Sequence, residues 1–225
     1  MHNILSAKNV KKFFFQGQTK LEVLKGVTAT FEQGKSYGIT GVSGTGKSTF
    51  MHILAGLDMP NSGEVHYNTN NLENFSEPER QRFLLKTLGL VFQLPYLIKE
   101  LSVIENVMIK GLIEGRAIEE CKEHARALLD FIGLGDKADS RPGSLSGGQQ
   151  QRIAIIRAIF NKPQFLLADE PTGNVDVETG KTIVDLLKKC QAEWEMGIIV
   201  SSHDSYVVEA METVLRLQDG VLGSQ

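Results

Sequence analysis

A nine-residue segment early in the chain constrains the fold more than any other feature of the sequence. It matches the phosphate-binding pattern G-x-x-x-x-G-K-[ST] at every fixed position. Its residues are Gly41, Val42, Ser43, Gly44, Thr45, Gly46, Lys47, Ser48 and Thr49. Residues 35–40, which precede it, are expected to form a short buried strand, and a helical pattern at 48–55 follows it. This order predicts a strand, a glycine loop and a helix in succession.

Such a succession predicts an anion-binding site. Backbone N–H groups at the helix N-terminus converge on the phosphates, and the helix dipole favours negative charge there. We expect Lys47 to reach the β- and γ-phosphates and the Ser48 hydroxyl to bind Mg²⁺. The alternative is an ordinary glycine turn followed by an incidental Lys-Ser pair, and the flanking patterns argue against it. The sequence therefore predicts a nucleoside triphosphate site.

The composition is that of an ordinary soluble globular protein of one or two domains. The 225 residues are 41% hydrophobic and 23% charged, and the net charge of −3 argues against a nucleic-acid-binding face. Two cysteines, Cys121 and Cys190, are too few for a disulfide framework and indicate a reducing compartment. No apolar stretch approaches the roughly 20 residues of a membrane helix. We expect another chain to supply the spanning segments if this protein acts at a membrane.

Patterns along the chain predict an α/β core interrupted by a helical subdomain at roughly 95–160. Strands are expected at 4–10, 22–31, 35–40, 64–67, 88–92, 165–168 and 197–201, and residues 68–71 are expected to form a polar loop. Capping patterns predict helix starts at Ser76 and Ser102. Further helices are expected at 117–132, 149–159, 177–195 and 204–211. Asp219-Gly220 predicts a hairpin turn near the C-terminus.

Two adjacent carboxylates follow the apolar strand predicted at 165–168. Ligands of open α/β sheets bind at the carboxyl ends of strands. Asp169 there can hold Mg²⁺, often through water, and Glu170 can polarise an attacking water. The alternative is a solvated strand end, and the phosphate loop in the same chain favours the functional interpretation.

The segment before the helix predicted at 149–159 indicates a second anion site. Ser146 is a good N-cap, and Gly147 and Gly148 leave the helix N-terminus bare. The alternative interpretation is an ordinary capped helix, which needs one serine but not two glycines and the three glutamines that follow.

The sequence Leu-Ser-Gly-Gly-Gln at 145–149, just upstream of Asp169 and Glu170, resembles the signature of the ATP-binding subunits of ABC transporters. The resemblance extends over nearly the whole chain. It implies a single domain over 1–225 with a P-loop NTPase core of mixed sheet and an antiparallel β part. That α/β core would comprise 1–94 and 161–225, and the helical signature subdomain would comprise 95–160.

The same resemblance implies roles for residues whose own sequence context is weak. Gln93 corresponds to the glutamine that senses Mg²⁺ and faces the membrane partner, and 173–176 to a loop that crosses the dimer interface. His203 corresponds to the histidine that contacts the γ-phosphate. Phe14 occupies the position of the aromatic that stacks on adenine, although the run of three phenylalanines leaves Phe13 and Phe15 as alternatives.

The assembly implied by the resemblance is a head-to-tail homodimer with two ATP molecules at its interface. Each phosphate loop would face the Ser146-Gly147-Gly148 segment of the other subunit. Integral membrane permease subunits are the implied partners, and no nucleic acid is expected. The implied location is peripheral, on the cytoplasmic face of the bacterial inner membrane. The implied activity is ATP hydrolysis with Mg²⁺, coupled to transport.

Several segments resemble one subgroup of this family, which contains lipoprotein-releasing, macrolide-exporting and cell-division ATPases. They are 23–27, 55–58, 105–107 and 169–174, and Arg141-Pro142 favours lipoprotein release. Departures at Gln149-Gln150, Val175 and Ser201-Ser202 are expected to leave the chemistry untouched. The chain length leaves no room for the fused membrane domain of a full-length macrolide exporter. Alternatives are a regulatory cell-division ATPase and a soluble ABC ATPase acting on DNA or ribosomes. The signature together with Glu170 excludes a small-molecule kinase.

An apolar segment at 94–98 directly follows Gln93, which is unusual for a surface loop. One interpretation is that its side chains pack inside the helical subdomain. The other is that part of it lines a groove for a short cytoplasmic helix of the membrane subunit.

Overall fold

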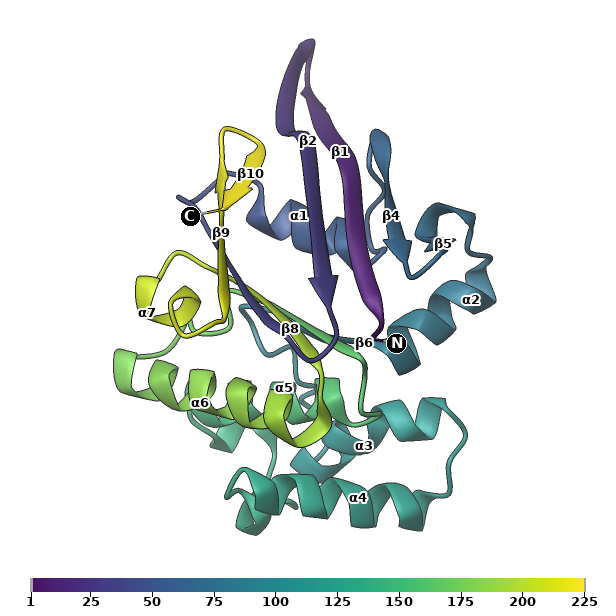
Figure 1. The fold of residues 1–225 in the computed structure, drawn as a ribbon. Coiled ribbons are helices and arrows are strands. Elements are labelled where there is room, and N and C mark those ends of the chain that lie inside the picture. Colours follow the sequence, from purple (N-terminus) through teal and green to yellow (C-terminus); the bar gives the residue numbers. More distant parts are fainter. Residues whose placement is uncertain (1, 225) are drawn as a thin grey trace.

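The computed structural model describes residues 2–224, so the two terminal residues of the predicted 1–225 domain lie outside it. Two sheets organise the fold, one antiparallel and one mostly parallel (Figure 1). The strands are β1 (Ile4–Gln16), β2 (Thr19–Glu32), β3 (Ser36–Thr40), β4 (Ser62–Tyr67), β5 (Asn70–Asn71), β6 (Leu88–Val91), β7 (Phe165–Asp169), β8 (Gly197–Ser202), β9 (Thr213–Gln218) and β10 (Val221–Ser224).

The helices fall mainly between β6 and β8 in the chain. The α-helices are α1 (Lys47–Leu54), α2 (Glu77–Arg82), α3 (Val103–Ile113), α4 (Ile118–Phe131), α5 (Gly147–Ile159), α6 (Val177–Trp194) and α7 (Ser205–Val208). Short turns of other helix types are η1 (Leu72–Asn74), the π-helical η2 (Phe83–Thr87), η3 (Gly135–Lys137) and η4 (Pro142–Ser144). No helix in the described part of the chain is long and apolar enough to cross a membrane.

The larger sheet has the order β10-β9-β3-β8-β7-β6, in which β9, β3, β8, β7 and β6 run parallel. Its central strands β3, β7 and β8 are almost continuously buried, as expected for a parallel sheet covered on both faces. The smaller sheet has the order β2-β1-β4-β5 and is antiparallel. The predicted mixed fold, with a P-loop core and an antiparallel part, is confirmed.

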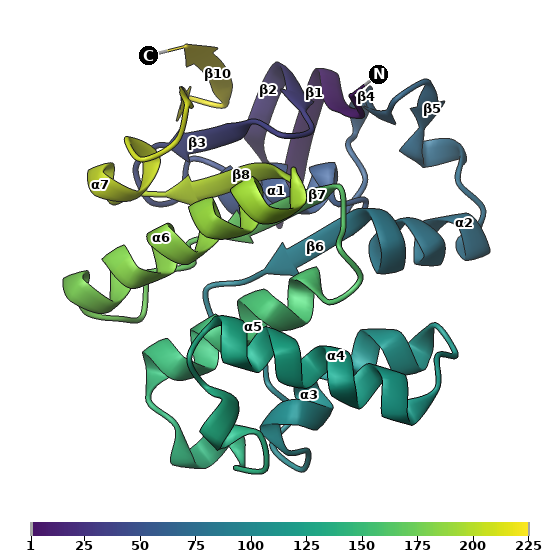
Figure 2. The same cartoon turned by 60° about the horizontal axis from the view of Figure 1, so that its bottom comes forward.

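Alternating side chains of the parallel sheet enter two different hydrophobic cores. Leu167 and Ile199 pack with α1 and the antiparallel sheet, so α1 lies between the two sheets. Leu166 and Ile198 pack on the other side, in the core that α3 to α6 form. Figure 2 shows α5 and α6 against the sheet, with α3 and α4 beyond α5. The sheet therefore separates the α1 core from the helical core.

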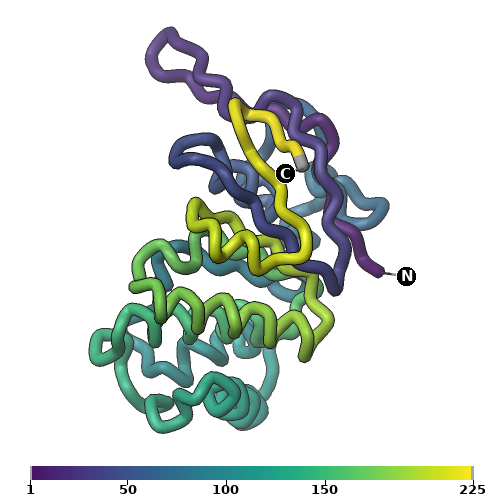
Figure 3. Tube along the Cα trace, turned by 60° about the vertical axis from the view of Figure 1, so that its left-hand side comes forward, coloured from purple at the N-terminus to yellow at the C-terminus, as the bar shows by residue number. Residues whose placement is uncertain are grey.

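The antiparallel sheet carries a projecting hairpin made by β1 and β2. The two strands pair almost to their ends, from Ile4 with Glu32 to Gln16 with Thr19, with three irregularities in the register. Both strands are longer than the sequence patterns predicted, and Gly17 lies at the tip with a φ of 63°. The tip of the hairpin stands away from the rest of the chain (Figure 3).

Local signals located most helix and turn boundaries correctly. Ser76 and Ser102 cap α2 and α3, each within a capping box. Asp219 and Gly220, with φ of 52° and 79°, form the predicted hairpin turn between β9 and β10.

Three local predictions were wrong. The expected polar loop at 68–71 contains the short strand β5, because Tyr67 pairs with Asn70 across a turn. The helix expected at 204–211 is only the four-residue α7, because the chain must turn into β9 to pair with β3. Helix α5 begins at Gly147, two residues early, because Ser146 and Gln149 cap each other reciprocally.

Candidate functional site

The carboxyl ends of four adjacent parallel strands deliver the predicted chemical groups to one edge of the sheet. Strand β3 leads into the phosphate loop, β8 into His203, β7 into Glu170 and β6 toward Gln93. These strands are neighbours in the order β3-β8-β7-β6. This edge is where open α/β sheets bind ligands.

The phosphate loop curls back on itself around the Lys47 ammonium. Gly46 precedes α1 in a left-handed conformation with a φ of 99°, which favours glycine. The Lys47 ammonium donates hydrogen bonds to the Gly41 carbonyl at 2.8 Å and the Val42 carbonyl at 3.4 Å. With 6% of its surface exposed, Lys47 holds a buried positive charge beside the bare N-terminus of α1.

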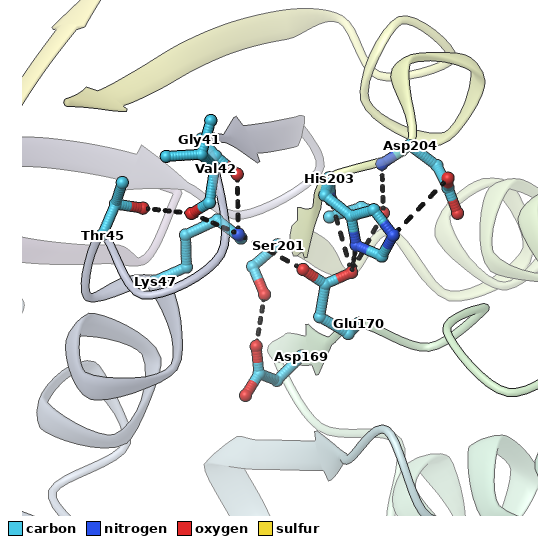
Figure 4. A network of polar contacts seen from close by, with 10 residues as sticks. Gly41, Val42, Thr45, Lys47, Asp169, Glu170, Ser201, His203 and Asp204 are labelled. Atoms are coloured by element: carbon cyan, nitrogen blue, oxygen red, sulfur yellow. Dashed lines mark hydrogen bonds and ion pairs between the residues drawn. The ribbon is translucent and has the colours of Figure 1, made fainter.

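A carboxylate from β7 balances this charge (Figure 4). Glu170 Oε1 lies 3.3 Å from the Lys47 ammonium, and the Glu170 side chain is only 13% exposed. Its other oxygen, Oε2, lies 2.9 Å from Nδ1 of His203 and accepts from the His203 backbone N–H at 3.3 Å. The lysine, the glutamate and the histidine therefore form one polar network at the sheet edge.

Glu170 adopts a strained backbone conformation. Its φ is 47°, a region that non-glycine residues rarely occupy and that costs of order 1–3 kcal/mol. The surrounding structure fixes it, because its N–H donates to the Ser201 carbonyl at 2.9 Å and its carbonyl accepts from the Gly173 N–H at 3.1 Å. Strained backbone conformations of this kind are often found at functional sites. At Glu170 the left-handed conformation turns the carboxylate toward Lys47.

Two serines at the end of β8, one of the departures from the family pattern, contact both predicted carboxylates. The Ser201 hydroxyl donates to Asp169, and the Ser202 hydroxyl donates to Glu170 Oε2 at 3.3 Å. Both serines are fully buried. Sequence patterns could not reveal these contacts, because they depend on the pairing of β7 with β8.

An open cleft of about 540 Å³ lies over this network. It is lined by Val23, Ser43, Gly44, Gly46, Lys47, Ser48, Thr49, Gln93, Glu170 and His203. Val23 from β2 is the one lining residue that was not predicted as a site residue. The cleft thus brings together most of the predicted loop with Gln93, Glu170 and His203.

The three phenylalanines of β1 divide between the two faces of the hairpin. Phe13 and Phe15 pack edge to face with their ring centres 5.6 Å apart. Phe14 lies on the other face, where the Lys12 ammonium is 5.1 Å from its ring centre. Lys12 itself is held by Asp58, just beyond α1, at 2.7 Å. Phe14 therefore lies on the face of the hairpin that is turned toward α1, although its side chain does not line the cleft.

Gln93 is linked to the loop that follows Glu170. The Asn174 side chain donates to the Gln93 carbonyl at 3.0 Å, and a Cβ added at Gly173 would lie 2.9 Å from the Gln93 amide nitrogen. The buried Gln151 of α5 donates to the neighbouring Phe92 carbonyl at 2.9 Å. Both the 173–176 loop and α5 are therefore tied to the backbone at Gln93.

The predicted second anion site does not join this cleft. Ser146 caps α5, and Ser146 and Gly147 are exposed. Gly148 is buried against the start of α6, where an added Cβ would lie 2.2 Å from the Thr179 methyl carbon. The two predicted anion sites, at the N-termini of α1 and α5, are therefore separate in the described chain, and only the first lies inside the cleft.

The oxygen donors near the cleft fit a magnesium ion that arrives with a nucleotide. No group of three or more His, Cys, Asp or Glu side chains suited to a metal occurs within residues 2–224. Mg²⁺ commonly keeps several waters and binds one or two carboxylates together with substrate phosphates. Ser48 and Gln93 line the cleft and Asp169 ends β7 next to it, which supplies such a donor set.

Comparison with known proteins gives a consistent result. The family model described as ABC transporter matches residues 24–173. A lipoprotein-releasing system ATP-binding protein LolD from Saccharophagus degradans is 41% identical over 222 residues, which cover 99% of this chain and 97% of the relative. A protein of the same name from Syntrophus aciditrophicus is 42% identical and covers 96% and 97%. An uncharacterized ABC transporter ATP-binding protein of Methanocaldococcus jannaschii is 40% identical and covers 96% of each chain.

Solved structures are similar over almost the whole chain. The bacterial ABC transporter cassette MJ0796, in a dimeric structure, is 35% identical, covers 98% of both chains and has a TM-score of 0.89. The same cassette in a dimeric post-hydrolysis state, bound to ADP and Pi, also has a TM-score of 0.89. The CbiO1 subunit from Clostridium perfringens, part of the cbiONQ ABC transporter complex, is 25% identical with a TM-score of 0.87.

We predict that Lys47→Ala weakens ATP binding by about ten- to a hundred-fold, the loss expected for one buried charge-assisted contact of roughly 1.5–3 kcal/mol. Fluorescence titration with ATP measures this. Lys35→Ala is the matched control, because Lys35 is exposed and pairs with Glu32 outside the cleft. Unchanged ATP affinity in a folded Lys47→Ala variant would contradict the position of the phosphate site.

Proposed function

We propose, from the premise that this chain belongs to the ABC transporter family, that it powers the release of lipoproteins from the inner membrane. It is the ATP-binding subunit of an ABC transporter and an ATPase of the ABC type. The observation that favours lipoprotein release is its identity of about 40% to LolD proteins over nearly their whole length. An exporter ATPase of the macrolide type and a regulatory cell-division ATPase are the alternatives. Identifying the membrane chains encoded beside this one would discriminate among these three functions, because lipoprotein release uses two related membrane chains.

The geometry supports separate roles for the residues of the cleft in phosphate binding, Mg²⁺ binding and proton transfer. Lys47 and the N-terminus of α1 would bind the β- and γ-phosphates of ATP, and Ser48, Asp169 and Gln93 would hold Mg²⁺. When bound, Mg²⁺ neutralises charge on the phosphates. Glu170 would act as the general base that accepts a proton from the attacking water.

The polar network suggests how ATP would free this base. In the chain alone, Glu170 contacts Lys47 and His203, which are the two groups expected to contact the γ-phosphate. A phosphate that takes over both contacts leaves the carboxylate free to accept a proton. Ser202 would keep Glu170 in position during this exchange, since its hydroxyl contacts the same oxygen as His203.

A homodimer would bring the N-terminus of α5 from one chain to the cleft of the other chain. The N-terminus of α5, with Ser146 and Gly147 exposed, lies outside the cleft of its own chain. In a head-to-tail pair it would meet the γ-phosphate bound by the other chain, so that two helix N-termini share one phosphate. Phe14 would stack on the adenine, because its ring lies on the α1 face of the hairpin while Phe13 and Phe15 lie on the opposite face.

The segment after Gln93 would contact the membrane subunits on the cytoplasmic face of the membrane. Leu97 packs against the helical core, as one interpretation of this segment expected, whereas Tyr96 is 64% exposed. Tyr96 also borders an apolar cleft of about 330 Å³, which we call the Tyr96 cleft. Its lining residues are Leu84, Leu88, Leu90, Tyr96, Ile98, Ile109, Lys110, Arg157 and Ala158. A short amphipathic helix of a membrane subunit would fit such a cleft.

The segment that carries Tyr96 is held rigidly to the helices. The fully buried Asn106 side chain accepts from the Ile98 N–H at 2.7 Å and donates to the Ile98 carbonyl at 3.0 Å. Arg157 of α5 donates to the Pro95 carbonyl at 2.6 Å and the Tyr96 carbonyl at 2.8 Å. Movement of the Tyr96 cleft would therefore be transmitted to α5 and to the adjacent Gln93.

We predict that Glu170→Gln keeps ATP binding, abolishes turnover and traps an ATP-bound dimer. The amide keeps the size of the side chain but cannot accept the proton, so the dimer forms and does not dissociate. Gel filtration with ATP and Mg²⁺ measures the dimer. The double variant Glu170→Gln/Ser146→Arg is the control and should stay monomeric, because a bulky cation at the N-terminus of α5 blocks closure. A monomeric Glu170→Gln variant at saturating ATP would contradict the proposed dimer.

We also predict that Tyr96→Glu leaves the basal ATPase of the isolated chain nearly unchanged and abolishes its stimulation by the membrane subunits. The measurement uses proteoliposomes that contain the membrane subunits of this transporter and a lipoprotein. Wild-type chains should release the lipoprotein with ATP, and Tyr96→Glu chains should not. Exposed Phe15, at the hairpin and away from this cleft, gives the control Phe15→Glu.

Two results would count against this assignment. If the membrane subunits stimulate the ATPase of a stable Tyr96→Glu variant normally, the Tyr96 cleft has no coupling role. If the membrane subunits stimulate the ATPase of the wild type but no lipoprotein is released, lipoprotein is excluded as the substrate. One of the two alternative functions is then favoured.

A further inference from the structure

Two half-buried cations line the clefts beside α3 without a carboxylate to balance them. Lys110 of α3 and Arg157 of α5 both line the Tyr96 cleft. Lys110 also lines a second cleft of about 620 Å³, together with Leu84, Lys86, Ile113 and Glu114. The two clefts share Leu84 and Lys110, so the Lys110 side chain lies where they meet. Within residues 2–224 no salt bridge joins either Lys110 or Arg157 to an acidic side chain.

The protein satisfies the Lys110 ammonium only in part. It donates to the Leu88 carbonyl at 3.3 Å and to the Ala158 carbonyl at 3.2 Å. These distances are longer than the roughly 2.7–2.9 Å of charge-assisted bonds, and an ammonium has three N–H donors. Burial, and after it the charge of Arg157, lowers the pKa of Lys110 to about 8. The charged form of Lys110 is therefore poorly stabilised in the chain alone.

A third cation in the same region, Lys86, is already paired and gives a useful contrast. Lys86 lies 2.7 Å from Glu114, which also contacts Arg116 at 2.6 Å. The only acidic residue that lines either cleft is thus engaged with other partners, within the described chain. A new carboxylate brought into the clefts would meet Lys110 and Arg157.

Apolar residues around the cations indicate what would carry that carboxylate. Tyr96 is 64% exposed and Ile113 is 68% exposed, one bordering each cleft. An amphipathic helix can cover such residues with its apolar face. Folding has already removed part of the water around the half-buried Lys110, so a carboxylate that approaches it displaces less water than it would at an exposed lysine. Charge complementarity and apolar burial therefore favour the same occupant.

We propose that Lys110 anchors an acidic side chain on the cytoplasmic helix of the membrane subunit that docks in the Tyr96 cleft. This inference rests on the proposed function and specifies the chemistry of the partner helix. The helix has an apolar face toward Tyr96 and Ile98, and an Asp or Glu within reach of the Lys110 ammonium. Arg157, held by Pro95 and Tyr96, adds positive charge on the other side of the same carboxylate.

A structural role for Lys110 is the competing explanation. Ala158 lies in the last turn of α5, and lysines commonly donate to the free carbonyls at helix C-termini. A role of that kind predicts that Lys110→Met lowers the melting temperature and the basal ATPase together. Docking predicts that both stay close to wild type while coupling to the membrane subunits is lost.

The experiment titrates the chain against the membrane subunits encoded beside it, reconstituted in nanodiscs, and measures stimulated ATPase. Lys110→Met should weaken the apparent affinity by about ten-fold or more, as the loss of one charge-assisted contact predicts. Lys86→Met, whose lysine is already paired inside the chain, should change it by less than about three-fold. Lys110→Glu should abolish stimulation, and a Lys in place of the facing acidic residue of the partner helix should restore it.

Each other outcome has a definite meaning. Stimulation lost in Tyr96→Glu but normal in a folded Lys110→Met variant would overturn this inference and leave the proposed function intact. A wild-type chain that the membrane subunits do not stimulate would contradict both. Lysine-dependent binding of the isolated chain to phosphatidylglycerol vesicles, with coupling unchanged in Lys110→Met, would assign the cations to lipid phosphates and also overturn it.

Discussion

The parallel hydrogen-bond ladder that joins β3, β8, β7 and β6 sets the positions of the phosphate loop, His203 and Glu170 in the cleft. In this ladder Thr40 pairs with Ser202, and Asp169 pairs with Ser201. The phosphate loop that follows Thr40 is therefore adjacent to His203 and to the carboxylates that end β7. A slip of one residue would turn these side chains to the opposite face of the sheet. Burial on both faces fixes the register, since the alternating side chains fill two separate cores.

The ladder also places the Lys47 ammonium beside the Glu170 carboxylate, and a bound triphosphate would change this ion pair. A buried lysine at the N-terminus of a helix is an unfavourable concentration of positive charge, and Glu170 compensates it at 3.3 Å. The compensation is costly to the backbone, because Glu170 holds a left-handed conformation. A triphosphate can replace the carboxylate as the anion beside Lys47. In the proposed mechanism Glu170 would then be available as the general base, so that ATP binding and hydrolysis would be linked.

Signals that act within a few residues were the ones that predicted structure from sequence. The phosphate loop, the helix caps at Ser102 and Ser146 and the Asp219-Gly220 turn each depend on local backbone chemistry. Contacts that depend on strand neighbours could not be predicted in this way. The hydroxyls of Ser201 and Ser202 contact the β7 carboxylates only because β7 and β8 are adjacent. The same limit explains why α7 is short and why Leu97 packs inward while Tyr96, one residue earlier, is exposed.

The central claim is that two chains build each ATP site, one with Lys47 and the other with Ser146. Mixing Ser146→Arg chains with Lys47→Ala chains tests it most directly, with ATPase as the readout and native mass spectrometry to verify heterodimers. In the heterodimer one site carries both faults and the other carries neither. We expect hydrolysis in the mixture and none in either variant alone. A mixture that forms heterodimers but stays as inactive as the separate variants would contradict the shared site.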